Sequence, residues 1–321
     1  MAINSRKILS GLGWAIIAIT IWSGSLVFLR LGVMTSLNAY DLTMLRFGVA
    51  ALILSPVIFH RTIKTARIRP VSLISMVATF GAPYVLLIAM AMKTAPATAA
   101  GALNPGVMAI ASLLLGWIIF NDRIGPVRVV GLIITTIGII LFTRADGTVT
   151  IGHLILGGTG IMWAIYALII RRTAIPALHA TAIIAVGSAL VYLPVYLMIL
   201  PKQIVSAPIM DVLIQVGFQG ILVSIVALYA FNRSTELLGP TAGASLPALI
   251  PVATLSLGVL ILNETAGADR VASAILVTVG LALILVGPPA MRWLSKFDLY
   301  GLNRKKRDTT NPIEQSSGDM K

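Results

Sequence analysis

Polar and aromatic side chains interrupt the long apolar stretches of this sequence, and they are its main candidates for chemistry. A hydroxyl, amide or phenol that faced lipid would lack a hydrogen-bonding partner, so we expect these side chains to face the protein interior. There they could line a path for a solute or form ordinary bonds between helices, and the aromatic ones could instead lie at a membrane surface. The candidates for contact with a solute are Trp22, Ser23, Arg46, Tyr84, Asn104, Trp163, Tyr166, Gln219, Tyr229 and Ser245.

Arg46 is the only basic residue well inside an apolar stretch, about one helical turn after Asp41. A charge at the centre of a bilayer costs about 2.5 kcal/mol or more, so Arg46 should face the interior of a helix bundle. It could attract the carboxylate of a solute, or it could bind carbonyls at a helix end and orient the helix. Acidic residues are absent from the middle of these stretches, and Glu236, the nearest, is expected in a solvated turn. A carboxylate proton relay is therefore not indicated.

Motifs for catalysis and metal binding are absent from the sequence. It contains no Gly-x-Ser-x-Gly, no His-Glu-x-x-His and no Gly-Lys dipeptide of a phosphate loop. It contains no cysteine, and His60, His153 and His179 fall in or beside predicted loops, where we expect solvated surface side chains. We therefore predict neither an enzyme nor a bound metal or cofactor.

The composition indicates a membrane protein, since 58% of the residues are hydrophobic and only 11% are charged. Soluble domains carry about 25% charged residues. A helix needs about 20 apolar residues to cross the hydrocarbon core. The sequence predicts an all-α integral membrane protein in a lipid bilayer, with ten transmembrane helices over residues 9–29, 42–59, 71–91, 97–119, 126–143, 151–170, 178–200, 210–231, 241–262 and 270–287.

The chain contains an internal repeat, because residues 100–142 align with residues 242–284 at a constant offset of 142, with 17 of 43 pairs identical. Glycine and proline fix backbone shape, so matched glycines and prolines indicate a repeated fold element. A weaker match at offset 141 pairs Trp22 with Trp163 and Arg30 with Arg171. The matched pairs include Gly101 with Gly243, Pro105 with Pro247, Gly116 with Gly258, Asn121 with Asn263, Gly125 with Gly267, Arg128 with Arg270 and Gly138 with Gly280.

Basic residues predict the orientation of the chain. With the N-terminus in the cytoplasm, 18 Lys and Arg residues fall on the cytoplasmic side and five on the other side. This bias follows the positive-inside rule, so both termini should be cytoplasmic. Because each repeat has five helices, an odd number, the second copy must be inverted, which places a solute site near the midplane between the halves.

The predicted organisation follows from the repeat and the charges. Residues 1–8 form a cytoplasmic N-terminus, 9–143 the first five-helix repeat and 144–150 an external linker. Residues 151–287 form the second repeat, and 288–321 a basic cytoplasmic tail that we expect to be disordered. The net charge of +13 could suggest nucleic acid, but positive-inside loops and a tail beside anionic lipid headgroups account for it. We predict no nucleic-acid partner and a functional monomer.

Three prolines lie within predicted helices. Pro105, Pro247 and Pro251 cannot donate a backbone hydrogen bond, so each frees a carbonyl one turn earlier in the chain. Such carbonyls are tolerated in a membrane where protein or a water-filled cavity supplies a partner. The helices could therefore bend around a central cavity, or the prolines could cause simple kinks.

Each half ends with an Ala/Gly-rich helix, an acidic turn and a last helix with a glycine: ATAAGALNPGVMAIASLLLGWIIFNDRIGPVRVVGLIITTIGIILF, then PTAGASLPALIPVATLSLGVLILNETAGADRVASAILVTVGLALILV. This pattern resembles the EamA-type ten-helix members of the drug/metabolite transporter superfamily. The Trp22 helix, the Leu45 to Phe47 segment and residues 163–172 also fit, and the resemblance covers residues 10–287. Asp122 stands where the family's first half usually has glutamate, and Glu264 keeps the glutamate. Both acids are expected to cap or shape a turn.

The resemblance implies a plasma-membrane carrier, in the inner membrane of a bacterium, of a kind that commonly exports amino acids, other metabolites or drugs. The repeat and the prolines agree with a secondary transporter that works by alternating access at a midplane cavity. The mildly polar, aromatic candidates suit zwitterionic or amphipathic solutes. A scaffold or sensor that moves no solute, and a carrier for metabolite uptake, are the alternatives.

Overall fold

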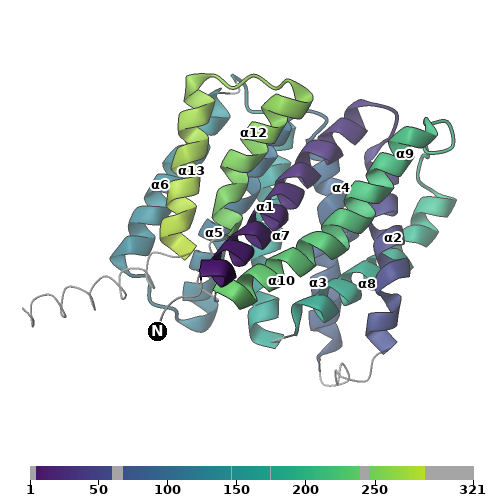
Figure 1. Ribbon diagram of the computed structural model, residues 1–321, viewed down its shortest axis with the longest axis horizontal. Helices are drawn as coiled ribbons and strands as arrows, with labels where there is room; N and C mark the ends of the chain where they lie inside the picture. Colours follow the sequence, from purple (N-terminus) through teal and green to yellow (C-terminus); the bar gives the residue numbers. More distant parts are fainter. Residues whose placement is uncertain (1–4, 60–67, 146, 174, 239–245, 286–321) are drawn as a thin grey trace, which may run out of the picture.

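The computed structural model describes residues 5–59, 68–145, 147–173, 175–238 and 246–285, and these form a bundle of helices without strands (Figure 1). In this part of the chain, nine helices are long and apolar enough to cross a membrane. The helices of the first half are α1 (Ser5–Met34), α2 (Ala39–Phe59), α3 (Pro70–Phe80), α4 (Ala82–Ala91), α5 (Ala97–Phe120) and α6 (Pro126–Ala145). Those of the second half are α7 (Ile151–Thr173), α8 (Ala177–Met198), α9 (Ile209–Gln215), η2 (Val216–Val226), α10 (Ala227–Leu238), η3 (Leu246–Leu249), α12 (Ile250–Leu262) and α13 (Ala268–Leu285).

The predicted span 241–262 differs from the other nine. Its first residues lie outside the described part, and the remainder is a shorter apolar segment, Leu246–Leu262. The 3₁₀ turn η3 precedes α12 here, because Pro247 and Pro251 remove two N–H donors from the α-helical ladder. Pro105, the equivalent of Pro247, lies inside α5, which stays α-helical.

The third helix of each half is irregular, although the sequence predicts one continuous helix in both places. In the first half the chain breaks at Gly81, between α3 and α4, and the next amide, that of Ala82, donates to Ser188 Oγ at 3.0 Å. In the second half, η2 is a π-helix between α9 and α10, and Ser224 Oγ donates to the Gln219 carbonyl five residues earlier at 3.2 Å. Irregular segments of this kind often mark functional sites.

Three pairs of equivalent helices from the two halves pack against each other in the described part of the chain, and α6 with α13 is the tightest of these pairs (Figure 1). Gly131 of α6 faces Gly280 and Ile284 of α13, whereas Gly138 faces Val277. Rising residue numbers on one helix thus meet falling numbers on the other, so the two helices are antiparallel. Glycines allow this close approach of backbones, which is a main source of helix association in lipid.

The pair α5 and α12 follows the same rule. Gly101 of α5 lies against Thr254 of α12, and Gly258 of α12 lies against Thr98 of α5. This pair is antiparallel too, and α2 packs against α8, its equivalent in the second half. Side chains buried at these crossings are mostly small, as the sequence of α5 suggests.

A buried acid fixes the N-terminal end of α2. Asn38 Oδ1 accepts hydrogen bonds from the amides of Tyr40 and Asp41, and Asp41 Oδ2 accepts one from the Asn38 amide, as in a capping box. Asp41 is fully buried, and it also accepts bonds from Tyr196 Oη at 2.6 Å and the Gln203 amide at 3.1 Å. The carboxylate therefore ties α2 to α8 and to the segment after α8.

We expect Gly280→Ala to destabilise the protein by about 1–3 kcal/mol, because the new methyl group would overpack the α6/α13 crossing. An added Cβ would lie 2.6 Å from the backbone nitrogen of Thr135 and 2.9 Å from the Gly131 carbonyl. The matched control is Gly157→Ala on α7, where nothing lies within 4 Å and alanine favours the helix. Thermal unfolding in detergent checks both variants, and equal melting temperatures would contradict close packing as the cause.

Candidate functional site

Six of the predicted site residues lie together in the interior, and Asn104 is central among them. The Tyr84 hydroxyl on α4 donates to Asn104 Oδ1 on α5 at 3.0 Å. Asn104 Nδ2 donates to Thr159 Oγ1 on α7 at 2.8 Å, and that hydroxyl donates to the Leu156 carbonyl. All three polar side chains are buried. Their hydrogen bonds join α4 and α5 of the first half to α7, the first helix of the second half.

An aromatic group borders this network. The ring of Phe80, at the end of α3, stacks on Tyr84 at 4.8 Å and on Tyr166 at 4.3 Å between centroids. Trp163 lies 5.8 Å from the same ring in a tilted arrangement. The sequence predicts Tyr84, Trp163 and Tyr166 as site residues, and the structure brings them together around Phe80. Phe80 itself was not among the predicted site residues.

Arg46 lies at a contact between the two halves. Its Nη1 donates to Gln219 Oε1 on η2 at 3.2 Å, and Gln219 Nε2 donates to the Ser25 carbonyl on α1 at 2.8 Å. Arg46 belongs to α2, which packs against α4, the helix that carries Tyr84 of the Asn104 network. No carboxylate is among the contacts that the described residues make with Arg46. We call the residues Arg46, Tyr84, Asn104, Thr159 and Gln219, with the aromatics around Phe80, the central cluster.

Trp22, Ser23 and Tyr229 are predicted site residues that do not join the central cluster. Trp22 packs against Phe231, with ring centroids 5.1 Å apart. Ser23 is fully buried on α1, and its hydroxyl has no hydrogen-bond partner among the described residues. Tyr229 is 58% exposed and contacts Trp14, so the alternative of a surface aromatic fits it better. Ser245 lies outside the described residues.

The two acidic turns have the same backbone shape. Asn121 and Asn263 each end a helix in the left-handed conformation, with φ of 52° and 53°. The amides of Asp122 and Glu264 then donate to the carbonyls of Gly116 and Gly258 at 3.3 and 3.2 Å. Asparagine adopts this conformation more readily than most residues, which is why it occupies both positions.

The two turn acids have different partners. Both carboxylate oxygens of Asp122 accept hydrogen bonds from Arg171 at the end of α7. The Glu264 carboxylate instead accepts bonds from the amides of Ala97 at 2.8 Å and Thr98 at 3.1 Å. These amides begin α5, where a negative charge also stabilises the positive end of the helix dipole. Each acid thus joins its turn to a different helix.

The expectation that His153 and His179 are solvated surface side chains was wrong. His153 is only 4% exposed, because it lies in the first turn of α7 with Nδ1 2.8 Å from Thr150 Oγ1. Both ring nitrogens of His179 are buried as well, and His60 lies outside the described residues. Glu236 is exposed as expected, but it lies in the last turn of α10 and not in a loop, and it accepts a bond from Arg233 at 2.7 Å. In the part of the chain that the structure describes, no three His, Cys, Asp or Glu side chains could hold a metal ion.

Some interior residues could have been found from sequence signals. Thr159 is the polar member of a Gly-Gly-Thr-Gly run in a predicted helix, and Gln215 precedes Gln219 by four residues, which places both on one helix face. Asn38 precedes Asp41 by three residues just before an apolar run, a spacing typical of a helix start. Asn38 and Asp41 bond to each other. Thr159, Gln215 and Gln219 bond to other helices that are distant in the chain, so those contacts could not have been predicted.

Apolar helices of membrane length around a buried polar and aromatic cluster are the features of a multi-pass membrane transporter. The chain belongs to the EamA-like transporter family, whose sequence pattern matches residues 9–144 and 150–286. This match confirms the predicted resemblance to EamA-type members of the drug/metabolite transporter superfamily. Members of the family are transporters and not enzymes.

Solved structures share the fold. One of them, described as "Crystal structure of protein", superimposes with a TM-score of 0.60 over 87% of this chain and 96% of its own. The two sequences are 20% identical, so the likeness concerns the fold alone. Comparison with curated proteins gives no significant match.

We expect Asp122→Asn to lower the melting temperature at pH 7, with the difference shrinking in acid. The hydrogen-bonded Arg171 guanidinium holds the pKa of the Asp122 carboxyl below its usual range. An unpaired carboxyl titrates near pH 4, and the ion pair contributes its full stabilisation above that pH. The contribution is lost as the pH falls through the lower pKa of the folded state. Melting curves from pH 7 downward measure it. In an Arg171→Gln background, Asp122→Asn should show a much smaller pH dependence, because only the weaker effect of Arg128 remains, and finding the same dependence there would refute the pairing.

Proposed function

We propose that this protein is a secondary transporter that moves small zwitterionic or amphipathic metabolites, such as amino acids, out of the cell by alternating access. The observation that carries the proposal is the central cluster, which contains polar side chains from both halves. Arg46 of α2 bonds Gln219 of η2, and Asn104 of α5 bonds Thr159 of α7. A relative movement of the two halves would therefore break and remake the bonds of this cluster.

We further infer that the halves are inverted copies, over residues 9–143 and 151–287, that rock about an axis in the membrane plane. The antiparallel packing of α6 with α13 and of α5 with α12 supports this, because such an axis reverses the direction of every helix it relates. The matching turns at Asn121 and Asn263 support it as well. The charge bias favours cytoplasmic termini, with residues 144–150 outside and the basic tail inside. The family resemblance favours a plasma membrane, the inner membrane in a bacterium.

The chemistry of the central cluster supports the proposed solute class. Arg46 contacts no carboxylate in the described part of the chain, so the carboxylate of a solute could replace Gln219 as its partner. The aromatic rings of Phe80, Trp163 and Tyr166 suit an apolar side chain or a cationic amine. Tyr84 and Gln219 are bonded and buried in the present conformation, so a solute would bind where the halves separate.

Transport in proteoliposomes tests the function. We expect a panel of amino acids, purines and cationic dyes, under an imposed proton gradient, to contain at least one solute that the wild-type protein moves. Asn104→Leu, which introduces the residue found at the equivalent position 246, should reduce that flux by about tenfold or more, since the Tyr84 and Thr159 hydroxyls lose their partner. Arg46→Gln should do the same.

The matched control is Ser256→Ala on the exposed face of α12, which should keep the wild-type flux. Melting temperatures identify variants that fail to fold. An inactive wild-type protein across the whole panel would favour the scaffold or sensor, and wild-type flux in both Asn104→Leu and Arg46→Gln would remove the central cluster from the solute path.

The proposed orientation can be tested because the sequence has no cysteine. A single cysteine placed at position 147 should react with a membrane-impermeant thiol reagent in intact cells, whereas one at position 65 should react only after the cells are opened. The linker at 147 is external in the proposed topology and position 65 is cytoplasmic. Labelling of both positions from the same side would exclude an odd number of helices between them.

A further inference from the structure

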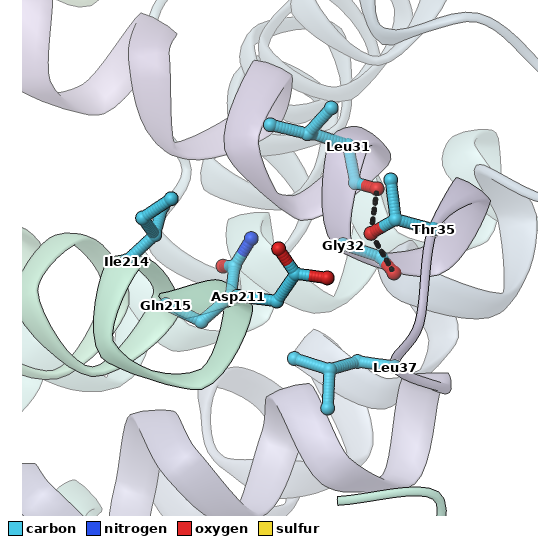
Figure 2. Close-up of a pocket in the computed structure, with 7 residues that line it drawn as sticks. All are labelled: Leu31, Gly32, Thr35, Leu37, Asp211, Ile214 and Gln215. Carbon is cyan, nitrogen blue, oxygen red and sulfur yellow. Dashed lines mark hydrogen bonds between the residues drawn. The ribbon is translucent and has the colours of Figure 1, made fainter. Parts of the chain in front are cut away.

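A small pocket outside the central cluster lies where the C-terminal end of α1 meets α9 (Figure 2). Its volume is about 100 Å³. Sites for drug-sized ligands measure about 300–1,000 Å³, whereas one water molecule needs roughly 10–15 Å³ on a comparable measure. The pocket therefore suits a small ion or a single functional group. It is lined by Leu31, Gly32, Thr35, Leu37, Asp211, Ile214 and Gln215.

Asp211 supplies a negative charge to this pocket. Its Oδ2 accepts one hydrogen bond from Ser36 Oγ at 2.5 Å. No basic side chain lines the pocket, and Asp211 forms no ion pair with any residue that the structure describes. A carboxylate with a single neutral donor retains acceptor capacity, since its two oxygens together offer about four lone-pair sites.

Gln215 supplies a buried acceptor that lacks a donor. The residue is 2% exposed, and its Nε2 donates to the Phe28 carbonyl of α1 at 2.7 Å. A carbonyl can only accept, so this bond determines which end of the amide is the oxygen. Oε1 is buried and has no hydrogen-bond partner among the described residues. Gly32 makes room for this amide, because a Cβ there would lie 2.9 Å from Gln215 Nε2.

Backbone oxygens complete the polar surroundings. Thr35 Oγ1 donates to the carbonyls of Leu31 at 2.9 Å and Gly32 at 3.3 Å, as Figure 2 shows. These carbonyls belong to the last turn of α1, a helix of 30 residues. The C-terminal end of a helix carries a partial negative charge, and such ends hold monovalent cations in membrane transporters. Carboxylate, amide and carbonyl oxygens are the ligands that hard cations prefer.

We propose that this pocket binds one small monovalent cation, either an inorganic ion such as Na⁺ or the primary ammonium group of a solute. Both sources satisfy the same chemistry, since each brings a positive charge to Asp211 and a partner to the orphan oxygen of Gln215. An anion is excluded because the pocket offers acceptors and a negative charge. The binding itself is independent of the proposed function, because it can be measured on purified protein without any transport.

The test is the melting temperature of the purified full-length chain in NaCl, KCl, methylammonium chloride and choline chloride at one ionic strength. We expect NaCl or methylammonium chloride to raise the melting temperature saturably, by about 3–6 °C at ten times the half-saturating concentration, relative to choline. Stabilisation by NaCl alone identifies an inorganic cation, and stabilisation by methylammonium alone identifies an ammonium group. Stabilisation by both shows that the pocket accepts either.

Substitutions of the residues that line the pocket test whether the cation-dependent stabilisation arises there. Asp211→Asn should raise the half-saturating concentration at least tenfold, and Gln215→Met should raise it as well. The matched control Asp269→Asn removes an exposed acid at the start of α13 and should leave the concentration unchanged. Equal melting temperatures of the wild-type protein in all four salts would overturn the proposal, and so would an unchanged response in Asp211→Asn.

Discussion

The close approach of antiparallel helices at glycines is the contact on which the rest of the structure depends. Lipid tails are as apolar as leucine, so burial of apolar side chains cannot hold these helices together as it does in water. Tight packing at Gly131, Gly138 and Gly280 replaces that force between α6 and α13, and Gly101 and Gly258 do so between α5 and α12. The central cluster lies beside this support and can use longer, polar side chains.

The contact between α1 and the third helix of the second half has a different chemistry. Two glutamines one turn apart, Gln215 and Gln219, each donate a hydrogen bond to a carbonyl of α1, at Phe28 and Ser25. The first lines the pocket beside Asp211, and the second bonds Arg46. The pocket and the central cluster are therefore consecutive steps along one helix interface. Hydrogen bonds can be exchanged at such an interface more readily than interlocked backbones can be separated.

Hydropathy predicted the apolar helices, and the internal repeat predicted two copies of one unit and the family. These signals are local or recur along the chain, so the sequence alone can show them. The break at Gly81 was not predicted, since it depends on Ser188, which is distant in sequence. The sequence brought Tyr84 and Asn104 into the site but also Tyr229, because hydropathy does not fix the rotation of an apolar helix about its axis. The burial of Asp41 was not predicted either, because its partners Tyr196 and Gln203 are distant in sequence.

The twin turns at Asn121 and Asn263 lie at opposite ends of the bundle, because α5 and α12 are antiparallel. At one end the acid is held by the exposed guanidinium of Arg171, and at the other end by two backbone amides. Dissolved salt weakens attraction between exposed charges far more than it weakens hydrogen bonds to a helix start. Ionic strength therefore acts unequally on the two ends of the bundle, because it weakens the ion pair at one turn more than the hydrogen bonds at the other.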